Sequence, residues 1–161
     1  MIKDIKTNKI NIYVQSIILL LFLCLSAMAA GSVTDSGEVS LGDGKYYIVI
    51  NCTADASDAS FPTDQWTSIN IDGYITMVEW YMGATALSND CGFKLFSAFD
   101  AELDVCGDVF EDLNTDTEGQ NVPLVGDVNA WRPIKGKLNP QIQGTNSVNS
   151  AVIVIRVWYQ R

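Results

Sequence analysis

The alternation of apolar and polar positions is most regular in the stretch Trp66–Tyr81, which reads WTSINIDGYITMVEWY. Two runs of strand-forming residues flank Asp72-Gly73, a dipeptide that favours a two-residue hairpin turn because both turn positions require a positive φ. Successive side chains of a strand point to opposite faces, so this turn gives the hairpin one apolar face. The residues of that face are Ile69, Ile71, Tyr74, Val78 and Trp80. The sequence therefore predicts a β-hairpin to which further strands are added.

Further strands are predicted on both sides of this hairpin. Lys45–Cys52 alternates so that one face is apolar, with Tyr46, Ile48, Ile50 and Cys52. Ala151–Tyr159 is apolar on both faces in its first half, which is typical of a central strand, and Arg156 indicates where one face reaches water. Shorter strands are predicted at Phe93–Phe99, Leu103–Val105, Val122–Val125 and Gly136–Ile142.

These patterns together predict an all-β fold. After the first 29 residues, no stretch of 11 or more residues has the 3.6-residue apolar period of a helix. Roughly eight short strands with Gly, Asp and Asn turns predict a single-domain antiparallel β-sandwich or jelly roll, over residues 45–161. Residues 30–44 are expected to be a flexible N-terminal segment or a strand that awaits a partner. An unpaired strand at either end would suit assembly by strand addition to a neighbour's sheet.

The first 29 residues have the three parts of a secretory signal peptide. Lys3, Lys6 and Lys9 form a basic region, Ile17–Leu25 is apolar, and Ala27-Met28-Ala29 is a cleavage motif. The apolar region is shorter than the roughly 20 residues that span a membrane. We therefore expect a signal-peptide helix, export to the periplasm or the extracellular space, and no membrane attachment after cleavage. Translation from Met28 would instead leave no signal and an intracellular or virion protein.

The charge of the chain argues against a nucleic-acid partner. The 161 residues include 10 Lys and Arg and 19 Asp and Glu, a net charge of −9. Cleavage after Ala29 leaves 7 basic and 18 acidic residues, a net charge of −11. A surface of this sign repels the phosphate backbone.

The composition also predicts a protein that is not an enzyme. The chain contains no histidine, which excludes Ser-His-Asp and Cys-His nucleophiles and the usual zinc sites. It has no glycine-rich phosphate loop. A pair of carboxylates for glycoside hydrolysis is compatible with the composition, but a sandwich of this size leaves little room for a deep cleft.

An acidic run is the one candidate for a metal site. The five carboxylates of the run lie at positions 1, 3, 5, 9 and 12 of an EF-hand frame, namely Asp100, Glu102, Asp104, Asp108 and Glu111. Position 6 of that frame requires glycine and is Val105 here, and the flanking stretches are predicted strands rather than helices. We therefore interpret the run as a solvated rim that keeps sheets from pairing edge to edge. A calcium site of another loop geometry is kept as an alternative, and no other cofactor is expected.

Three cysteines remain after removal of Cys24 with the signal peptide. Cys52 lies on the apolar face of its strand and is expected to be buried. Cys91 and Cys106 flank a predicted hairpin and are candidates for a disulfide in an oxidising compartment. Alternation opposes their direct pairing, because Phe93 and Leu95 would then share a face with acidic residues. A β-bulge would be needed to reconcile the two.

Aromatic residues give an alternative function. Five of them could form a sugar-stacking face, although aromatic stripes in strands more often cover a core: Trp66, Tyr81, Trp131, Trp158 and Tyr159. The alternative is therefore a secreted module that binds carbohydrate or calcium.

A longer pattern resembles small all-β proteins of phages and prophages over about 90 residues. It comprises Ile71-Asp72-Gly73-Tyr74 through Val78-Glu79, Gly83–Ala86, Ser88–Asp90, Asp104–Gly107, Asp112-Leu113, Val122–Leu124, Arg132-Pro133, Gly136–Leu138, Asn146–Ala151 and a last strand that ends in Arg161. The resemblance implies a virion-associated structural component with no catalytic residues, whose partner is protein, including copies of itself in an oligomer or a virion. Cys91, Cys106 and the signal peptide depart from the pattern.

Overall fold

The computed structural model describes residues 30–88, 90–108, 110, 113, 118–125 and 128–161, so the predicted signal-peptide helix lies outside the described residues. Within these ranges the protein is all-β, with antiparallel strand pairs and no helix. Consequently no described helix is long and apolar enough to cross a membrane.

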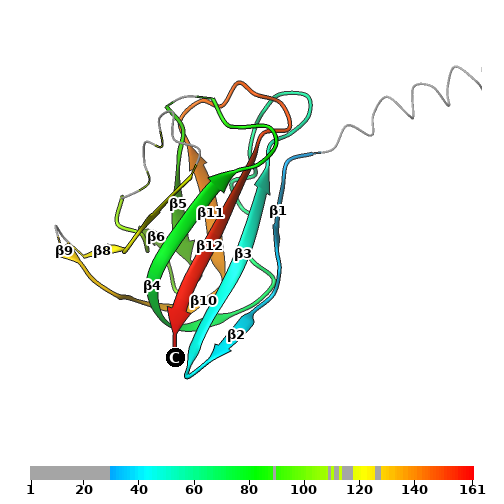
Figure 1. Ribbon diagram of the computed structural model, residues 1–161. Coiled ribbons are helices and arrows are strands. Elements are labelled where there is room, and N and C mark those ends of the chain that lie inside the picture. The colour runs from blue at the N-terminus through cyan, green and yellow to red at the C-terminus, as the bar shows by residue number, and fades with distance from the viewer. Residues whose placement is uncertain (1–29, 89, 109, 111–112, 114–117, 126–127) are drawn as a thin grey trace, which may run out of the picture.

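The largest sheet has seven strands and curls into a half-barrel (Figure 1). Its central order is β1-β3-β12-β4-β10, with β2 beside β1 on the edge of β3 and β7 beside β10 on the edge of β4. The strands are β1 (Ser32–Asp35), β2 (Val39–Gly42), β3 (Lys45–Thr53), β4 (Ile71–Met82), β7 (Glu118–Asn121), β10 (Arg132–Gly136) and β12 (Val152–Gln160).

A smaller sheet covers the inner face of the half-barrel (Figure 1). It has the order β11-β5-β6, with β5 (Gly92–Ser97), β6 (Asp100–Asp104) and β11 (Leu138–Gln143). A third, two-stranded sheet is the hairpin of β8 (Leu124–Val125) and β9 (Val128–Asn129), which extends away from the body. Side chains of both larger sheets, such as Ile50, Ile155, Phe93 and Leu138, belong to one buried core.

The two strands with the clearest sequence pattern are confirmed. In β3, Ile48, Ile50 and Cys52 are fully buried, and Tyr46 packs against the core. The predicted central strand is β12, which pairs with β3 over its whole length and with β4 over most of it. Alternate residues of β12 point inward and are buried: Ile153, Ile155, Val157 and Tyr159.

The predicted hairpin at Asp72-Gly73 is wrong. Both residues lie inside β4, which continues without a turn from Ile71 to Met82. Gly73 has a φ of 155° and pairs with Ile134 of β10. A Cβ at Gly73 would lie 2.2 Å from the carbonyl oxygen of Gln160. The glycine therefore allows the end of β12 to approach the backbone of β4 closely, and no turn is made there.

The predicted apolar face of the hairpin is also wrong in part. Ile71 and Ile75 are buried, and then Val78 and Trp80, so the inward parity changes between Ile75 and Val78. The β4–β12 register shifts at the same place, between Trp158 and Tyr159, which is a β-bulge. Tyr74 consequently points outward and is 53% exposed, and Ile69 precedes the strand.

A segment between β3 and β4 closes one side of the half-barrel. Gln65 accepts a hydrogen bond from the N–H of Val33 in β1 at 2.6 Å. Thr67 donates its N–H to the carbonyl of Leu138 in β11 at 2.8 Å and accepts the N–H of Leu138 at 2.9 Å. We call residues 63–68 the strap, because they join an edge of the large sheet to an edge of the small one.

Asp35 of β1 fastens the end of the strap. Its carboxylate accepts the N–H and the hydroxyl of Ser68 and the N–H of Gly37. Partial burial opposes ionisation of Asp35, but these hydrogen bonds outweigh it and hold its pKa below the usual value. The strap is therefore held by an ionised carboxylate at neutral pH.

The strands at both ends of the described chain are paired. Residues 30–44, expected to be flexible or to await a partner, contain β1 and β2, and both pair with β3. The other end is β12, in the middle of the sheet. Neither end of the described chain is therefore an unpaired strand, although β1 and β2 lie at the edge of the large sheet. Two edges are also unsuited to an added strand, because β10 contains Pro133 and β11 contains Pro140, which have no N–H to donate.

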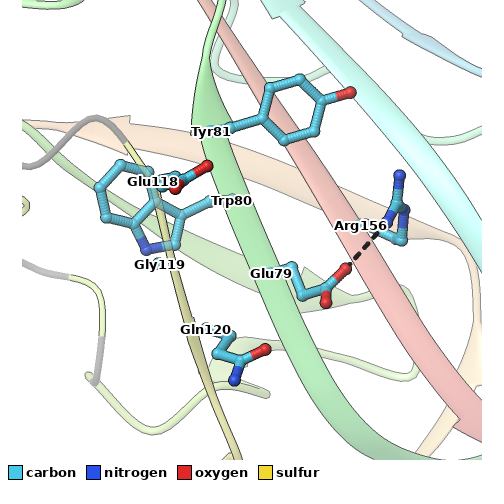
Figure 2. A pocket seen from close by; sticks show the side chains of 7 residues that line it. All are labelled: Glu79, Trp80, Tyr81, Glu118, Gly119, Gln120 and Arg156. Carbon is cyan, nitrogen blue, oxygen red and sulfur yellow. Dashed lines mark hydrogen bonds and ion pairs between the residues drawn. The ribbon is translucent and has the colours of Figure 1, made fainter.

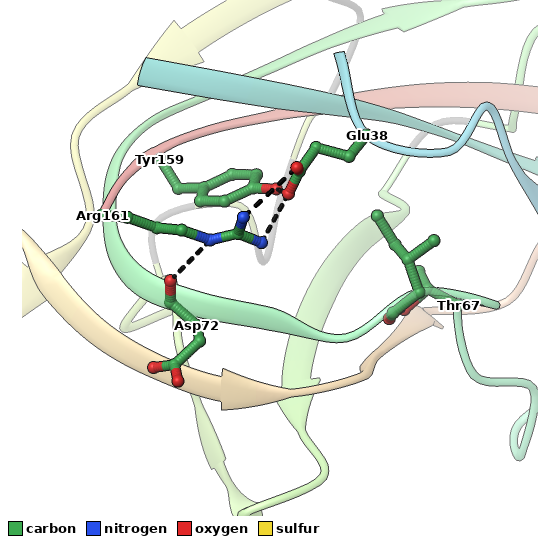
Figure 3. Close-up of polar contacts among 6 residues, drawn as sticks. Glu38, Thr67, Asp72, Tyr159 and Arg161 are labelled. Carbon is green, nitrogen blue, oxygen red and sulfur yellow. Dashed lines mark hydrogen bonds and ion pairs between the residues drawn. The ribbon is translucent and has the colours of Figure 1, made fainter. Parts of the chain in front are cut away.

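Arg161 fastens the end of β12 to its neighbours (Figure 3). Its guanidinium contacts the carboxylate of Glu38 at 2.6 Å and the carbonyl oxygen of Asp72 at 3.2 Å. The same group lies over the ring of Tyr46, 4.7 Å from its centroid. Tyr159 also donates its hydroxyl to Glu38. Burial, followed by this hydrogen bond, raises the pKa of Tyr159 well above its ordinary value, so the phenol stays a donor.

Replacing Gly73 by alanine is expected to lower the free energy of unfolding by about 2–6 kcal/mol. A residue with a side chain in this backbone region costs about 1–3 kcal/mol, and crowding against Gln160 adds about 1–3 kcal/mol. Gly37→Ala is the control, because Gly37 also has a positive φ but no atom within 4 Å of an added Cβ. It should lose only about 1–2 kcal/mol. Urea unfolding measures both, and equal losses would contradict the close-approach explanation.

Candidate functional site

Asp104, one of the candidate calcium ligands, binds the backbone of its own loop. One carboxylate oxygen accepts the N–H groups of Leu95 at 2.9 Å and Cys106 at 3.0 Å, and the other accepts the N–H of Asp108 at 2.8 Å. Asp104 is only 8% exposed. The interpretation of the run as a solvated rim is therefore wrong for Asp104, which holds the loop after β6 against β5.

Of the other four candidate ligands, Asp108 is the one whose side chain the structure describes. Asp108 is exposed and forms an ion pair with Lys94 at 2.8 Å, as the rim interpretation expects of it. Asp100 and Glu102 lie on β6, but their side chains, like the whole of Glu111, lie outside what the structure describes. Among the described residues no group of three or more His, Cys, Asp or Glu could hold a metal ion.

The candidate disulfide between Cys91 and Cys106 is not formed, because Cys52, Cys91 and Cys106 are all free and buried. The chain after β6 runs back along β5, but the two thiols meet different parts of it. Val105 bonds to the carbonyl of Leu95, whereas the N–H of Leu113 bonds to the carbonyl of Cys91. Cys106, which follows Val105, therefore lies near Leu95 rather than beside Cys91. The sequence alternation had already opposed their direct pairing.

Two of the buried thiols, Cys52 and Cys106, are also poor nucleophiles. Burial raises the pKa of Cys52 to about 12. Burial and then the charge of Asp104 raise the pKa of Cys106 well above its usual value. Both stay protonated at neutral pH, and a thiol attacks only as the thiolate. Their place in the core fits small apolar side chains.

The side of the half-barrel opposite the strap carries an apolar groove of about 400 Å³. It lies where β10 and the start of β4 meet the end of β5, and its lining includes Val105 and Ile134. Two large apolar side chains at the groove face solvent, with Phe99 79% and Tyr74 53% exposed. We call this the open-side groove. The alternation of apolar and polar positions does not reveal this groove, because it predicts Phe99 as the end of a strand and predicts no strand over residues 132–135.

A second exposed apolar feature is the β8–β9 hairpin. Val125 and Val128 pair with one another at its described end and are 48% and 66% exposed. Its base is anchored, because Arg132 donates to the carbonyl of Leu124 at 2.8 Å, and the N–H of Leu124 donates to the carbonyl of Cys106 at 3.0 Å. The hairpin thus presents two valines on a fixed base.

The outer face of the large sheet carries charged and aromatic side chains. Arg156 of β12 forms an ion pair with Glu79 of β4 at 3.0 Å. Its guanidinium carbon lies 5.5 Å from the ring centroid of Tyr47 and 5.8 Å from that of Trp158, and these two rings are 5.0 Å apart. Contacts on three sides therefore fix the guanidinium.

Two depressions adjoin on this outer face. The first, the Arg156 cleft, has a volume of about 510 Å³ and lies over β4, β7 and β12; Figure 2 shows its lining of Glu79, Trp80, Tyr81, Glu118, Gly119, Gln120 and Arg156. The second, the Trp158 groove, has a volume of about 440 Å³ and is lined by Leu41, Lys45, Tyr46, Thr76, Trp131, Trp158, Tyr159 and Gln160. The two depressions are neighbours because Arg156 and Trp158 lie two residues apart on the same face of β12.

The structure brings together three of the five aromatic residues predicted as a sugar-stacking face. Trp131 and Trp158 line the Trp158 groove, and Tyr81 lines the Arg156 cleft. Tyr159 is 1% exposed and stacks on Tyr46, so it serves the core. Trp66 lies in the strap and donates to Asp64. The sequence signal identified these aromatic residues, but not Arg156, Glu118 and Gln120 between them.

Asp104→Ala is expected to lower the free energy of unfolding by about 3 kcal/mol, because three N–H groups lose a charged acceptor. Asp108→Asn is the matched control and should lose no more than about 1 kcal/mol, the worth of an exposed ion pair.

Thermal unfolding should give the same Tm for the unaltered protein with calcium and with a chelator. A rise in Tm with calcium that is abolished in both variants would instead support a calcium site.

No protein-family model matches this chain, and the searches of curated proteins and of solved structures found no match either. Its function is therefore inferred from the groove, the hairpin and the outer face of the molecule itself.

Proposed function

We propose that this chain is a non-catalytic structural subunit that works by protein–protein contact, as a component of a phage-like virion or of an extracellular assembly. The observation that carries the proposal is the open-side groove with Phe99 and Tyr74 exposed beside it. Large apolar side chains that gather at one surface are typical of a protein interface. The resemblance to virion-associated proteins of phages supports the same role.

The occupant that we propose for the groove is a second copy of the chain. Val125 and Val128 form an apolar projection, and the open-side groove is an apolar depression on the same molecule. When one molecule carries two complementary surfaces, copies associate through them. Both surfaces are built mainly from apolar side chains, so this contact differs from the strand addition expected from the sequence.

The finer fold assignment, a β-sandwich of jelly-roll type, is part of the same proposal. Two antiparallel sheets contribute side chains to one core, which supports it. Export through the N-terminal signal peptide is likewise proposed from the sequence pattern. Assembly would then take place outside the cytoplasm, without nucleic acid as a partner, in keeping with the acidic net charge.

Self-association is expected to appear as oligomers whose fraction rises with protein concentration on a sizing column with light scattering, and these should persist in chelator. Phe99→Asp and Val128→Asp should each raise the dissociation constant at least about tenfold, which corresponds to about 1.4 kcal/mol. Leu41→Asp is the control, because Leu41 is 53% exposed on β2, at the other edge of the sheet. A monomer at every concentration, or equal effects of all three variants, would contradict the proposal.

Export is tested by sequencing the N-terminus of the protein that its cell produces. Cleavage of the signal peptide predicts a chain that begins at Ala30, because signal peptidases cut after the small residues of the A-x-A motif. A chain that begins at Met28 or Ala29 would instead indicate the internal start and an intracellular product. The two results differ by one or two residues, which Edman sequencing or intact mass resolves.

A further inference from the structure

The Arg156 cleft presents both donors and acceptors at fixed positions. Glu79 pairs with Arg156 across β4 and β12, and the β4–β7 register places Gln120 beside Glu79 and Glu118 beside Tyr81. Side chains of directly paired residues share a face of the sheet. Glu118 and Gln120 are exposed and Tyr81 is 38% exposed, so the cleft opens to solvent.

Gly119 sets the position of β7 at this cleft. It pairs with Trp80, and a Cβ at Gly119 would lie 2.9 Å from the indole Nε1 of Trp80. The missing side chain lets β7 lie close over the inward-pointing indole. This closeness keeps Glu118 and Gln120 in register with the outer-face residues of β4.

The charges of the cleft favour a neutral ligand. Two carboxylates, Glu79 and Glu118, and one guanidinium give the lining a formal charge of −1, which opposes binding of a phosphate or a sulfate. Arg156 compensates Glu79, which removes most of the attraction for a cation. What remains are acceptors on the two glutamates, a donor and an acceptor on Gln120, and donors on Arg156. Vicinal hydroxyl groups, each a donor and an acceptor, match this set.

The aromatic side chains supply the apolar half of such a site. Tyr81 stands in the cleft, and the adjoining Trp158 groove adds Trp158 and Trp131, which is 57% exposed. The C–H face of a sugar ring packs on an aromatic ring, and its hydroxyl groups meet the polar side chains around it. The volumes of the cleft and the groove lie in the range of small-molecule sites, about 300–1,000 Å³.

We propose that the outer face of the large sheet binds a short, neutral oligosaccharide that extends from the Arg156 cleft into the Trp158 groove. Arg156 is held by Glu79, Tyr47 and Trp158. Its donors are thus already oriented, which lowers the entropy cost of binding. This site lies on β2, β3, β4, β7 and β12 with Trp131 beside them, and it shares no lining residue with the open-side groove. The proposal is therefore independent of the proposed self-association.

The experiment is isothermal titration calorimetry of the mature full-length protein with maltotriose, cellotriose and tri-N-acetylchitotriose. At least one of the three should bind with a dissociation constant below 5 mM. Tyr81→Ala, Gln120→Ala and Trp131→Ala each remove an exposed side chain, and each should weaken that binding at least fivefold. Phe99→Asp is the control and should leave the sugar affinity unchanged.

Three results would overturn the site. One is no heat of binding from any of the three sugars up to 10 mM; another is affinities that the Tyr81, Gln120 and Trp131 variants leave unchanged. The third is tighter binding of a sulfated glycan than of the neutral ones, which would mean that the charge argument fails. Circular dichroism of each variant confirms that the sheet is intact, so a loss of affinity cannot come from unfolding.

Discussion

The pairing of β12 with both β3 and β4 is the interaction on which the rest of the structure depends. Alternate residues of this strand form the middle of the core, while Arg156 and Trp158 point outward between their neighbours. A strand that is paired on both sides has its backbone N–H and C=O groups satisfied within the sheet. Core-facing and outward-facing side chains therefore alternate on one strand, so a shift of β12 would displace both sets.

The two sides of the half-barrel differ, because the strap closes one side and the open-side groove lies on the other. On one side the strap satisfies edge groups of β1 and β11 through Gln65 and Thr67. On the other side the sheets meet at the open-side groove, where Phe99 is left in solvent. In the proposed assembly, a second molecule would cover Phe99 and the groove on this side, as the strap covers the sheet edges on the other side. The same asymmetry is the basis for proposing a groove for assembly and not the β10 edge, since Pro133 interrupts the hydrogen bonding that a strand added to β10 would need.

The described acidic residues serve two different purposes in this protein. Asp35 and Asp104 accept backbone N–H groups and hold loops. Glu38 binds Arg161, and Glu79 binds Arg156. A carboxylate that accepts N–H groups or faces a guanidinium is already satisfied, so a high count of Asp and Glu did not imply a metal site. The net charge of the chain is a property of its surface, whereas the purpose of each carboxylate depends on its neighbours.

The sequence by itself determined the all-β class, the inward face of β3, the central position of β12 and the burial of Cys52. These follow from alternation within one strand, which is a local property. Only the tertiary structure decided that Asp72-Gly73 lies inside β4, that a bulge changes the parity before Val78, and that Asp104 turns inward. The first two depend on residues far away in the sequence, such as Gln160, whose carbonyl lies beside Gly73. Asp104 instead turns toward N–H groups that lie within nine residues of it but come together only in the folded loop. The cleft likewise needed the pairing of β4 with β7 and β12, because register between distant strands is set by the packing of the whole core.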